Sequence, residues 1–248
     1  MKIRYFSDLH LEFIEDNEMN TFLKQIPLPN NNEKEICILA GDIGHPHDNK
    51  YDIFMKFISN HFTKSFVISG NHEYYHNTRT IEETNQFMEN YFIQYENISF
   101  LHNTYEYYEN KCFIGSVLWS NIKEPKYTIN DTKMIPHLDV DKYNQMNKEC
   151  VAFLEKTIQT NENCVVITHH MPSHSLIDQK YKNPILLPYN QWFYCDMESL
   201  FVPQIKAWFY GHTHMPSSKK IKEIPFICNP IGYPGENNKN DFSLHIII

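Results

Sequence analysis

Five short segments of this sequence carry residue types that bind divalent metal ions. In chain order they are Asp8-Leu9-His10, Gly41-Asp42, Gly70-Asn71-His72-Glu73, Thr168-His169-His170 and Gly211-His212-Thr213-His214. Imidazole nitrogens and carboxylate or amide oxygens suit Mn, Fe, Zn or Mg ions, and none of the five segments contains a cysteine that would indicate a thiolate zinc site. Together the segments favour a metal centre built from nitrogen and oxygen ligands.

Each segment alone has a simpler structural explanation. Asp8 could cap the segment that follows it, and Gly41-Asp42 is typical of a turn. Asn71 could be a turn residue, His169 could be a hydrogen-bonded core residue, and the final His pair could be solvated. The metal hypothesis therefore depends on the joint occurrence of the segments and on the elements that precede them.

Each segment follows a short apolar run. These runs, at residues 3–6, 36–40, 66–69, 164–168 and 207–210, predict buried β-strands. Helical spacing of apolar residues predicts helices over 51–62, 80–95 and 142–158. The alternation indicates an α/β fold, in which residues beyond the carboxyl ends of parallel strands can converge.

The middle of the chain has a different pattern. Residues 98–101, 104–108 and 112–118 follow one another with short gaps and predict a β-meander or hairpin. Residues 120–141 and 172–190 are mostly polar and lack periodicity, so we expect long surface loops that could lie over a site. Tyr74, Tyr75 and His76 could line a substrate pocket, although adjacent aromatic residues are more typical of a core.

Length and composition restrict the function classes. A chain of 248 residues with 42% hydrophobic residues is compatible with one globular domain over residues 1–248. The formal charge of -8 and the presence of only two arginines, Arg4 and Arg79, argue against extended nucleic-acid binding. The six cysteines form no C-x-x-C pair and predict reduced core residues. We expect no signal peptide, no membrane span and a cytoplasmic location.

The ordered motifs D-x-H, G-D, G-N-H-E, H and G-H-x-H, from Asp8 to His214, resemble those of the calcineurin-like metallophosphoesterase family. The segments at 118–120 (Leu-Trp-Ser) and 229–233 (Asn-Pro-Ile-Gly-Tyr) resemble a narrower branch of uncharacterised small phosphohydrolases. The resemblance implies a four-layer α/β fold with a central β-sandwich flanked by helices.

The resemblance also implies two divalent metal ions, either Mn, Fe, Zn or Mg, and a role for each motif residue. One ion would be held by Asp8, His10 and His214, and the other by Asn71, His169 and His212. Asp42 would bridge the two ions and thereby take part in catalysis. His72 would lie near the leaving group of the substrate.

This ligand set predicts hydrolytic chemistry. Two divalent ions outweigh the carboxylates of Asp8 and Asp42, so the inner shell would attract a phosphoryl group even in an acidic protein. Metal binding lowers the pKa of bound water to about 7, which generates a hydroxide for in-line attack. Glu73 could fix a neighbouring residue by hydrogen bonding or could simply be an acidic residue at a helix N-terminus.

Departures from the family pattern indicate the substrate class. Protein phosphatases continue the second motif as V-D-R-G, and their arginine helps to bind a phosphomonoester, whereas this chain continues Asp42-Ile43-Gly44-His45. A small-molecule phosphate ester, more specifically a phosphodiester, is the predicted substrate. The alternatives are a protein phosphatase-like phosphomonoesterase and a catalytically silent interaction module. The sequence identifies no protein partner.

Overall fold

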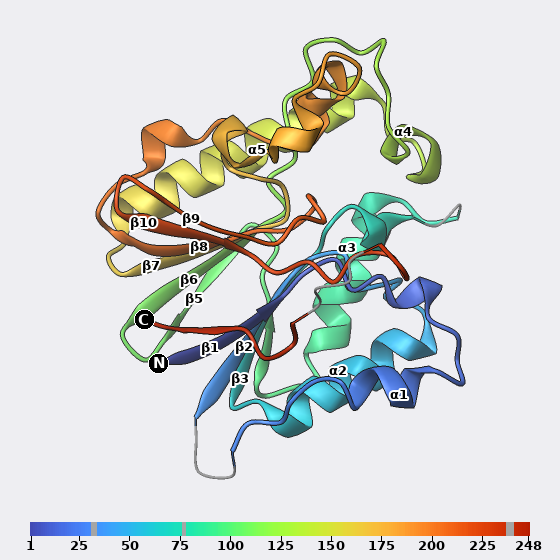
Figure 1. Ribbon diagram of the computed structural model, residues 1–248, viewed down its shortest axis with the longest axis vertical. Coiled ribbons are helices and arrows are strands. Elements are labelled where there is room, and N and C mark those ends of the chain that lie inside the picture. The colour runs from blue at the N-terminus through green and yellow to red at the C-terminus, as the bar shows by residue number, and fades with distance from the viewer. Residues whose placement is uncertain (31–33, 76–77, 237–240) are drawn as a thin grey trace.

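The computed structural model describes residues 1–30, 34–75, 78–236 and 241–248. Two β-sheets pack face to face in the middle of the molecule, and helices cover both outer faces (Figure 1). The predicted four-layer α/β fold with a central β-sandwich is confirmed. Among the described residues, no helix is long and apolar enough to cross a membrane.

The first sheet has five strands in the order β11-β1-β2-β3-β4. Strands β1 to β4 are parallel, and β11 pairs antiparallel with β1. The strands are β1 (Lys2–Phe6), β2 (Glu35–Ala40), β3 (Lys64–Ile68), β4 (Ile98–Phe100) and β11 (His245–Ile247).

The second sheet has six strands in the order β5-β6-β7-β8-β10-β9. Its four central strands are parallel, whereas the edge strands β5 and β9 are antiparallel to their neighbours. The strands are β5 (Thr104–Tyr108), β6 (Lys111–Ser116), β7 (Cys164–Thr168), β8 (Ile205–Phe209), β9 (Ser217–Ile221) and β10 (Ile224–Cys228).

The helices lie on the outer faces of the two sheets (Figure 1). Side chains define where they begin, because Asp48, Thr80 and Asp139 each accept a hydrogen bond from a backbone N–H of the first turn. The first sheet is covered by α1 (Met19–Leu23), α2 (Asn49–His61) and α3 (Ile81–Phe92), and the second by α5 (Val140–Thr160). A short helix, α4 (Asp131–Met134), lies in the segment before α5.

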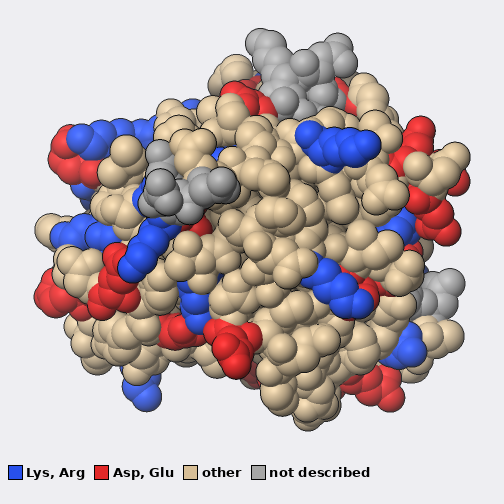
Figure 2. Space-filling model, turned by 90° about the horizontal axis from the view of Figure 1, so that it is seen from below, with Lys and Arg blue, Asp and Glu red and all other residues tan. Residues whose placement is uncertain are grey.

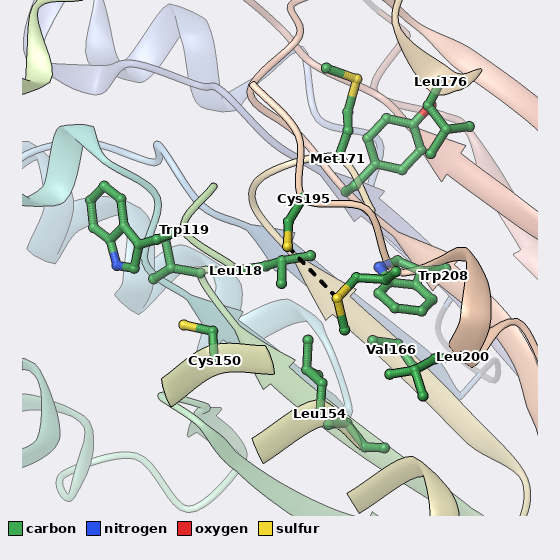
Figure 3. Packing of buried hydrophobic residues seen from close by; sticks show 14 of the residues in the cluster. Leu118, Trp119, Cys150, Leu154, Val166, Met171, Leu176, Cys195, Leu200 and Trp208 are labelled. Carbon is green, nitrogen blue, oxygen red and sulfur yellow. Dashed lines mark hydrogen bonds between the residues drawn. The ribbon is translucent and has the colours of Figure 1, made fainter. Parts of the chain in front are cut away.

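The central strands are buried on both faces, which explains their continuous apolar sequences. In β2, Ile36 and Ile38 point into the core between the sheets, whereas Cys37 and Leu39 pack toward the helices. On the other side of the molecule, one cluster joins the segment after β6, α5 and β7, and Figure 3 shows its members Leu118, Leu154 and Val166.

The structure confirms the predicted strands and helices but corrects the arrangement in the middle of the chain. Of the three strands predicted there, the second and third, β5 and β6, form a hairpin. The strand at 98–100 instead pairs with β3 in the first sheet, where Ile98 is the partner of Ser65. An apolar sequence pattern indicates a buried strand, but it does not determine which sheet the strand joins. All six cysteines are free and buried, as predicted.

Candidate metal centre

The predicted ligand side chains meet at one edge of the sandwich, beyond the carboxyl ends of β1, β2, β3, β7 and β8. The possible ligands form three groups, and within each group the ligand atoms all lie within 4.8 Å of one another. The groups are Asp8 with His10 and His214, His10 with Asp42 and His72, and Asp42 with His169 and His212. Asn71 joins the last group, because its Oδ1 lies 3.0 Å from Nε2 of His169. The structure thus brings all seven predicted ligands together.

In the first group, two ring nitrogen atoms lie so close together that a cation between them would stabilise the arrangement. Nε2 of His10 lies 3.0 Å from Nε2 of His214, and the latter lies 3.5 Å from Oδ1 of Asp8. The Nδ1–H groups donate to carboxylates, His10 to Glu12 at 3.1 Å and His214 to Glu236 at 2.7 Å. In the neutral rings both Nε2 atoms therefore present lone pairs to each other.

The second group also gathers acceptors. His169 donates through Nδ1 to the Ala40 carbonyl at 2.9 Å, so its Nε2 presents a lone pair to Asn71 Oδ1 and to Asp42 Oδ2 at 3.2 Å. Nε2 of His212 is buried and has no hydrogen-bond partner among the described residues. Because lone pairs face inward in both groups, the donor set fits two divalent ions, with Asp42 between them.

Asp131 determines which atom of Asn71 faces the centre. Nδ2 of Asn71 donates to Asp131 Oδ1 at 2.9 Å and to the Tyr75 hydroxyl at 3.2 Å, which leaves Oδ1 pointing at His169. Tyr75 itself donates to Asp131 at 2.5 Å. Burial raises the pKa of the Asp131 carboxyl. Such outer contacts orient metal ligands.

Without metal ions, protons are the alternative source of positive charge. Burial opposes a charge on His169, but the nearby Asp42 carboxylate outweighs this effect and raises the His169 pKa to about 10. Burial also acts on His212, where it lowers the pKa well below its ordinary value. Because metal ligands must be deprotonated, binding of ions releases such protons.

Backbone strain is concentrated at the ligands. Asp8, His10, Asp42, His212 and His214 have φ angles of 53°, 49°, 53°, 65° and 47°, in the left-handed region that non-glycine residues rarely adopt. Each such residue costs about 1–3 kcal/mol and persists only where its surroundings enforce it. Two contacts that do so are the hydrogen bonds from Asp8 N to Gly41 O and from His212 N to Asp8 Oδ1, at 3.0 and 2.9 Å.

Glu73 holds the ends of β2 and β3 together. Its buried carboxylate accepts backbone N–H groups of Gly70 at 2.6 Å, Asp42 at 3.0 Å and Ile43 at 2.7 Å. The hydrogen bonding predicted as one role for Glu73 is therefore observed, although the partners are backbone N–H groups. Gly70 is needed there, because an added Cβ would lie only 2.2 Å from Asp42 Oδ1.

His72 lies beside the ligands in the short helix η2 (His72–Tyr74). Its Nδ1 donates to Glu12 at 2.9 Å, its Nε2 lies 3.2 Å from the Tyr233 hydroxyl, and its backbone N–H donates to Asp42 at 2.8 Å. Burial opposes protonation, but Asp42 and Glu12 outweigh it and raise the His72 pKa to about 9. Burial would also raise the Glu12 pKa, yet the hydrogen bonds from His10 and His72 lower it to about 2.

A cavity of about 410 Å³ opens beside the ligands. Asp42, Asn71, His72, His212 and His214 form part of its wall. Both long loops that were expected to lie over a site contribute to it, residues 129–131 from the first and 177–190 from the second. Tyr75 also lines the cavity, whereas Tyr74 is in the core and His76 lies outside the described residues.

Three carboxylates at this site were not identified from the sequence: Glu12, Asp131 and Glu236. Glu12 follows His10 by two residues, the spacing that in an extended segment would place both on one side, and this was a usable signal. Asp131 is the first residue of the short helix α4 and Glu236 lies in a turn, and neither belongs to a motif. Of the histidines near the motifs, His170 is buried and bonded to Val117 O and to the Tyr143 hydroxyl, which indicates a structural role.

Comparison with known proteins identifies the family. The family model described as calcineurin-like phosphoesterase matches residues 1–216. The chain belongs to this family. The calcineurin-like phosphoesterase motifs recognised in the sequence, from Asp8 to His214, all lie within the matched region.

One relative and one solved structure match nearly the whole of this calcineurin-like phosphoesterase chain. Uncharacterized protein L509 of Acanthamoeba polyphaga mimivirus is 31% identical over 259 residues, which cover 95% of this chain and 92% of that protein. The crystal structure of phosphopantetheinyl hydrolase (PptH) from Mycobacterium tuberculosis has a TM-score of 0.73 at 15% identity, covering 94% of this chain and 90% of that one. The second comparison shows a shared fold.

Proposed function

We propose that this protein is a metal-dependent phosphoester hydrolase with two divalent ions, and that it hydrolyses a small organic phosphoester, preferably a diester. The observation that carries the proposal is the meeting of seven candidate ligand side chains beside a cavity, with Asp42, Asn71, His212 and His214 in its wall. Two such ions, when bound, would neutralise phosphoryl oxygens and lower the pKa of a coordinated water.

The protein's own residues have distinct tasks in this proposal. Asp8, His10 and His214 would hold one ion, and Asn71, His169 and His212 the other, with Asp42 shared between them. Glu12, Glu236 and the Ala40 carbonyl fix the tautomers of His10, His214 and His169 through their Nδ1–H groups. These contacts keep the ligand nitrogens aimed inward before any ion arrives, which lowers the reorganisation that binding requires.

His72 is placed to give a proton to the leaving group. With Nδ1–H bound to Glu12, a protonated imidazole carries its second proton on Nε2, on the cavity side. The neighbouring Asp42 and Glu12 carboxylates outweigh burial and raise the His72 pKa to about 9 in the metal-free protein, and the hydrogen bond to Glu12 is independent of the ions. Transfer of the proton to the departing oxygen would avoid release of an unstable alkoxide.

The scarcity of cationic side chains favours a diester over a monoester. Among the described residues that line the cavity there is neither lysine nor arginine. Arg4 is committed elsewhere, because its Nε donates to Glu35 at 2.6 Å in the interior of the first sheet. A monoester dianion would lack the bidentate arginine that protein phosphatases supply, whereas a diester carries one negative charge and needs less neutralisation.

The surface gives no support to a long nucleic-acid substrate. On the face seen in Figure 2, blue Lys and Arg are interspersed with red Asp and Glu and form no continuous basic track. We also propose a cytoplasmic location, supported by six free cysteines, because a reducing compartment preserves thiols.

Turnover of model esters tests the function. Metal-depleted protein is loaded with Mn²⁺ and assayed with bis-p-nitrophenyl phosphate and p-nitrophenyl phosphate. We expect metal-dependent hydrolysis with the larger kcat/KM for the diester. Metal-loaded protein that is inert toward both esters would support the silent interaction module instead, and a larger value for the monoester would support a phosphomonoesterase.

A further inference from the structure

We propose that the cavity beside the metal ligands binds an uncharged apolar substituent of the substrate. The preferred substrates would then be diesters with one phosphate and an aliphatic or aromatic chain, as opposed to nucleotides with additional phosphates. The inference rests on the proposed function, since it concerns the substituent of the same phosphoester.

Apolar side chains from the two long loops form part of the cavity wall. Ile177, Leu186 and Tyr189 come from the loop at 172–190, and Ile129 comes from the loop at 120–141. Ile177 is only 3% exposed, whereas Leu186 is 36% exposed at the rim. Pockets of this size lined by aliphatic and aromatic residues bind the apolar parts of small molecules.

Most polar side chains of the cavity already have partners inside the protein. Asn190 donates to the Tyr181 carbonyl at 3.2 Å, Asp131 holds Asn71, and Glu236 holds His214. The Thr213 hydroxyl lacks a partner among the described residues, but its oxygen is buried. Few groups therefore remain to recognise the hydrogen-bonding edge of a base or the hydroxyls of a sugar.

The charges of the wall disfavour a second phosphate. Asp131 and Glu236 are carboxylic residues of the lining, and no described lining residue is a lysine or arginine. Lys180 is close by, with its ammonium 4.6 Å from the centre of the Tyr181 ring, but it does not line the cavity. An anionic group away from the metal ligands would thus lose water without gaining a cation.

An exposed apolar strip continues from the rim toward solvent. Ile185, Leu186 and Leu187 are consecutive and are 80%, 36% and 50% exposed. Only Leu186 of the three lines the cavity. A substrate chain longer than the cavity could continue over this strip, so chain length should affect catalysis.

The test measures kcat/KM with Mn²⁺ for methyl, butyl and hexyl 4-nitrophenyl phosphate. We expect a rise of about fourfold per methylene that becomes buried. Leu186→Ser should lower the value for the hexyl ester several-fold and leave the methyl ester unchanged. Ile93→Ser is the matched control, since this isoleucine is equally exposed at 80% but lies outside both the cavity and the apolar strip, and it should behave like the wild type.

The outcomes separate this inference from the proposed function. Equal kcat/KM for all three chain lengths, or a preference for a dinucleoside diphosphate, would overturn the apolar subsite while leaving the hydrolase in place. If no ester is hydrolysed, the proposed function fails, and calorimetry then compares methyl hexylphosphonate with methyl methylphosphonate on metal-loaded protein. Tighter binding of the hexyl compound supports the subsite, and equal affinities refute it.

Discussion

His10 and His214 are separated by 204 residues in the chain, yet their Nε2 atoms lie 3.0 Å apart. Carboxylates occupy Nδ1 of both rings, so the facing nitrogens cannot satisfy each other when both rings are neutral. A cation in this place converts a repulsive contact into two ligand bonds.

Metal removal should therefore destabilise the protein. Ions that bind only the folded state add about 2.7 kcal/mol each at a hundredfold excess over Kd. Two ions would add about 5.4 kcal/mol, so for a chain of this size we expect chelation to lower Tm by about 10 to 20 °C, measured by circular dichroism with and without EDTA. An Asp42→Ala variant is the control and should lose most of the Mn²⁺-dependent shift; an unchanged wild-type Tm would contradict the metal centre.

Metal stoichiometry should distinguish the bridging ligand from the others. We expect two ions per chain, about 3.5–4 Å apart as in other two-metal sites. Asp42→Ala should weaken both ions, and His10→Ala mainly one, as measured by elemental analysis after gel filtration. His174→Ala serves as the control, because this exposed histidine is outside the three ligand groups. Retention of two tightly bound ions in Asp42→Ala would remove Asp42 from the bridging position.

His72→Ala should reduce catalysis without loss of metal. Proton transfer contributes about 10² to 10⁴ in rate, and an alkoxide needs the proton more than nitrophenolate does. The expected result is a larger loss for alkyl esters than for nitrophenyl esters, compared at equal metal occupancy. Equal losses for the two ester types, or a missing ion, would assign His72 to a structural or ligand role.

Glu12→Gln should affect both His10 and His72, because one oxygen of Glu12 accepts from both rings. Loss of an outer contact typically costs about 10- to 100-fold in metal affinity or activity. We expect kcat to fall by that factor with KM little changed. Glu15→Gln, an exposed carboxylate three residues along, is the matched control. Wild-type kcat and metal affinity in Glu12→Gln would show that Glu12 is dispensable.

Asp131→Asn should weaken the ion held by Asn71. The substituted amide can donate toward Asn71, so the Asn71 side chain can turn its own NH₂ toward His169. We predict that the site containing Asn71 binds its ion about 10- to 100-fold more weakly, whereas the other ion is retained. Calorimetric titration with Mn²⁺ measures both affinities. Two unaltered binding steps would show that Asp131 does not orient Asn71.

The sequence was sufficient to predict the strands that carry the ligands. Runs such as residues 36–40 are apolar on both faces because they are buried on both faces, and the motif residues follow directly after them. Their order along the chain reflects topology, since the carboxyl ends of parallel strands meet at one edge.

Other features depend on contacts that local patterns do not encode. The strand at 98–100 joins β3 because of the chain path after α3, and β9 (Ser217–Ile221) is a polar edge strand without apolar alternation. Asp131 reaches Asn71 across 60 residues, so nothing near either position indicates their contact. The loops that line the cavity were expected to cover a site, but their side-chain contacts follow from tertiary packing.

The proposed metal ligands come from both layers of the sandwich, with Asp8, His10, Asp42 and Asn71 after strands of the first sheet and His169, His212 and His214 after strands of the second. Either sheet alone presents half a coordination shell. The ability to capture ions should thus arise late in folding, after the two layers have docked, because contacts so remote in the chain are slow to form. The time at which the protein binds metal during refolding would then report when the two layers dock.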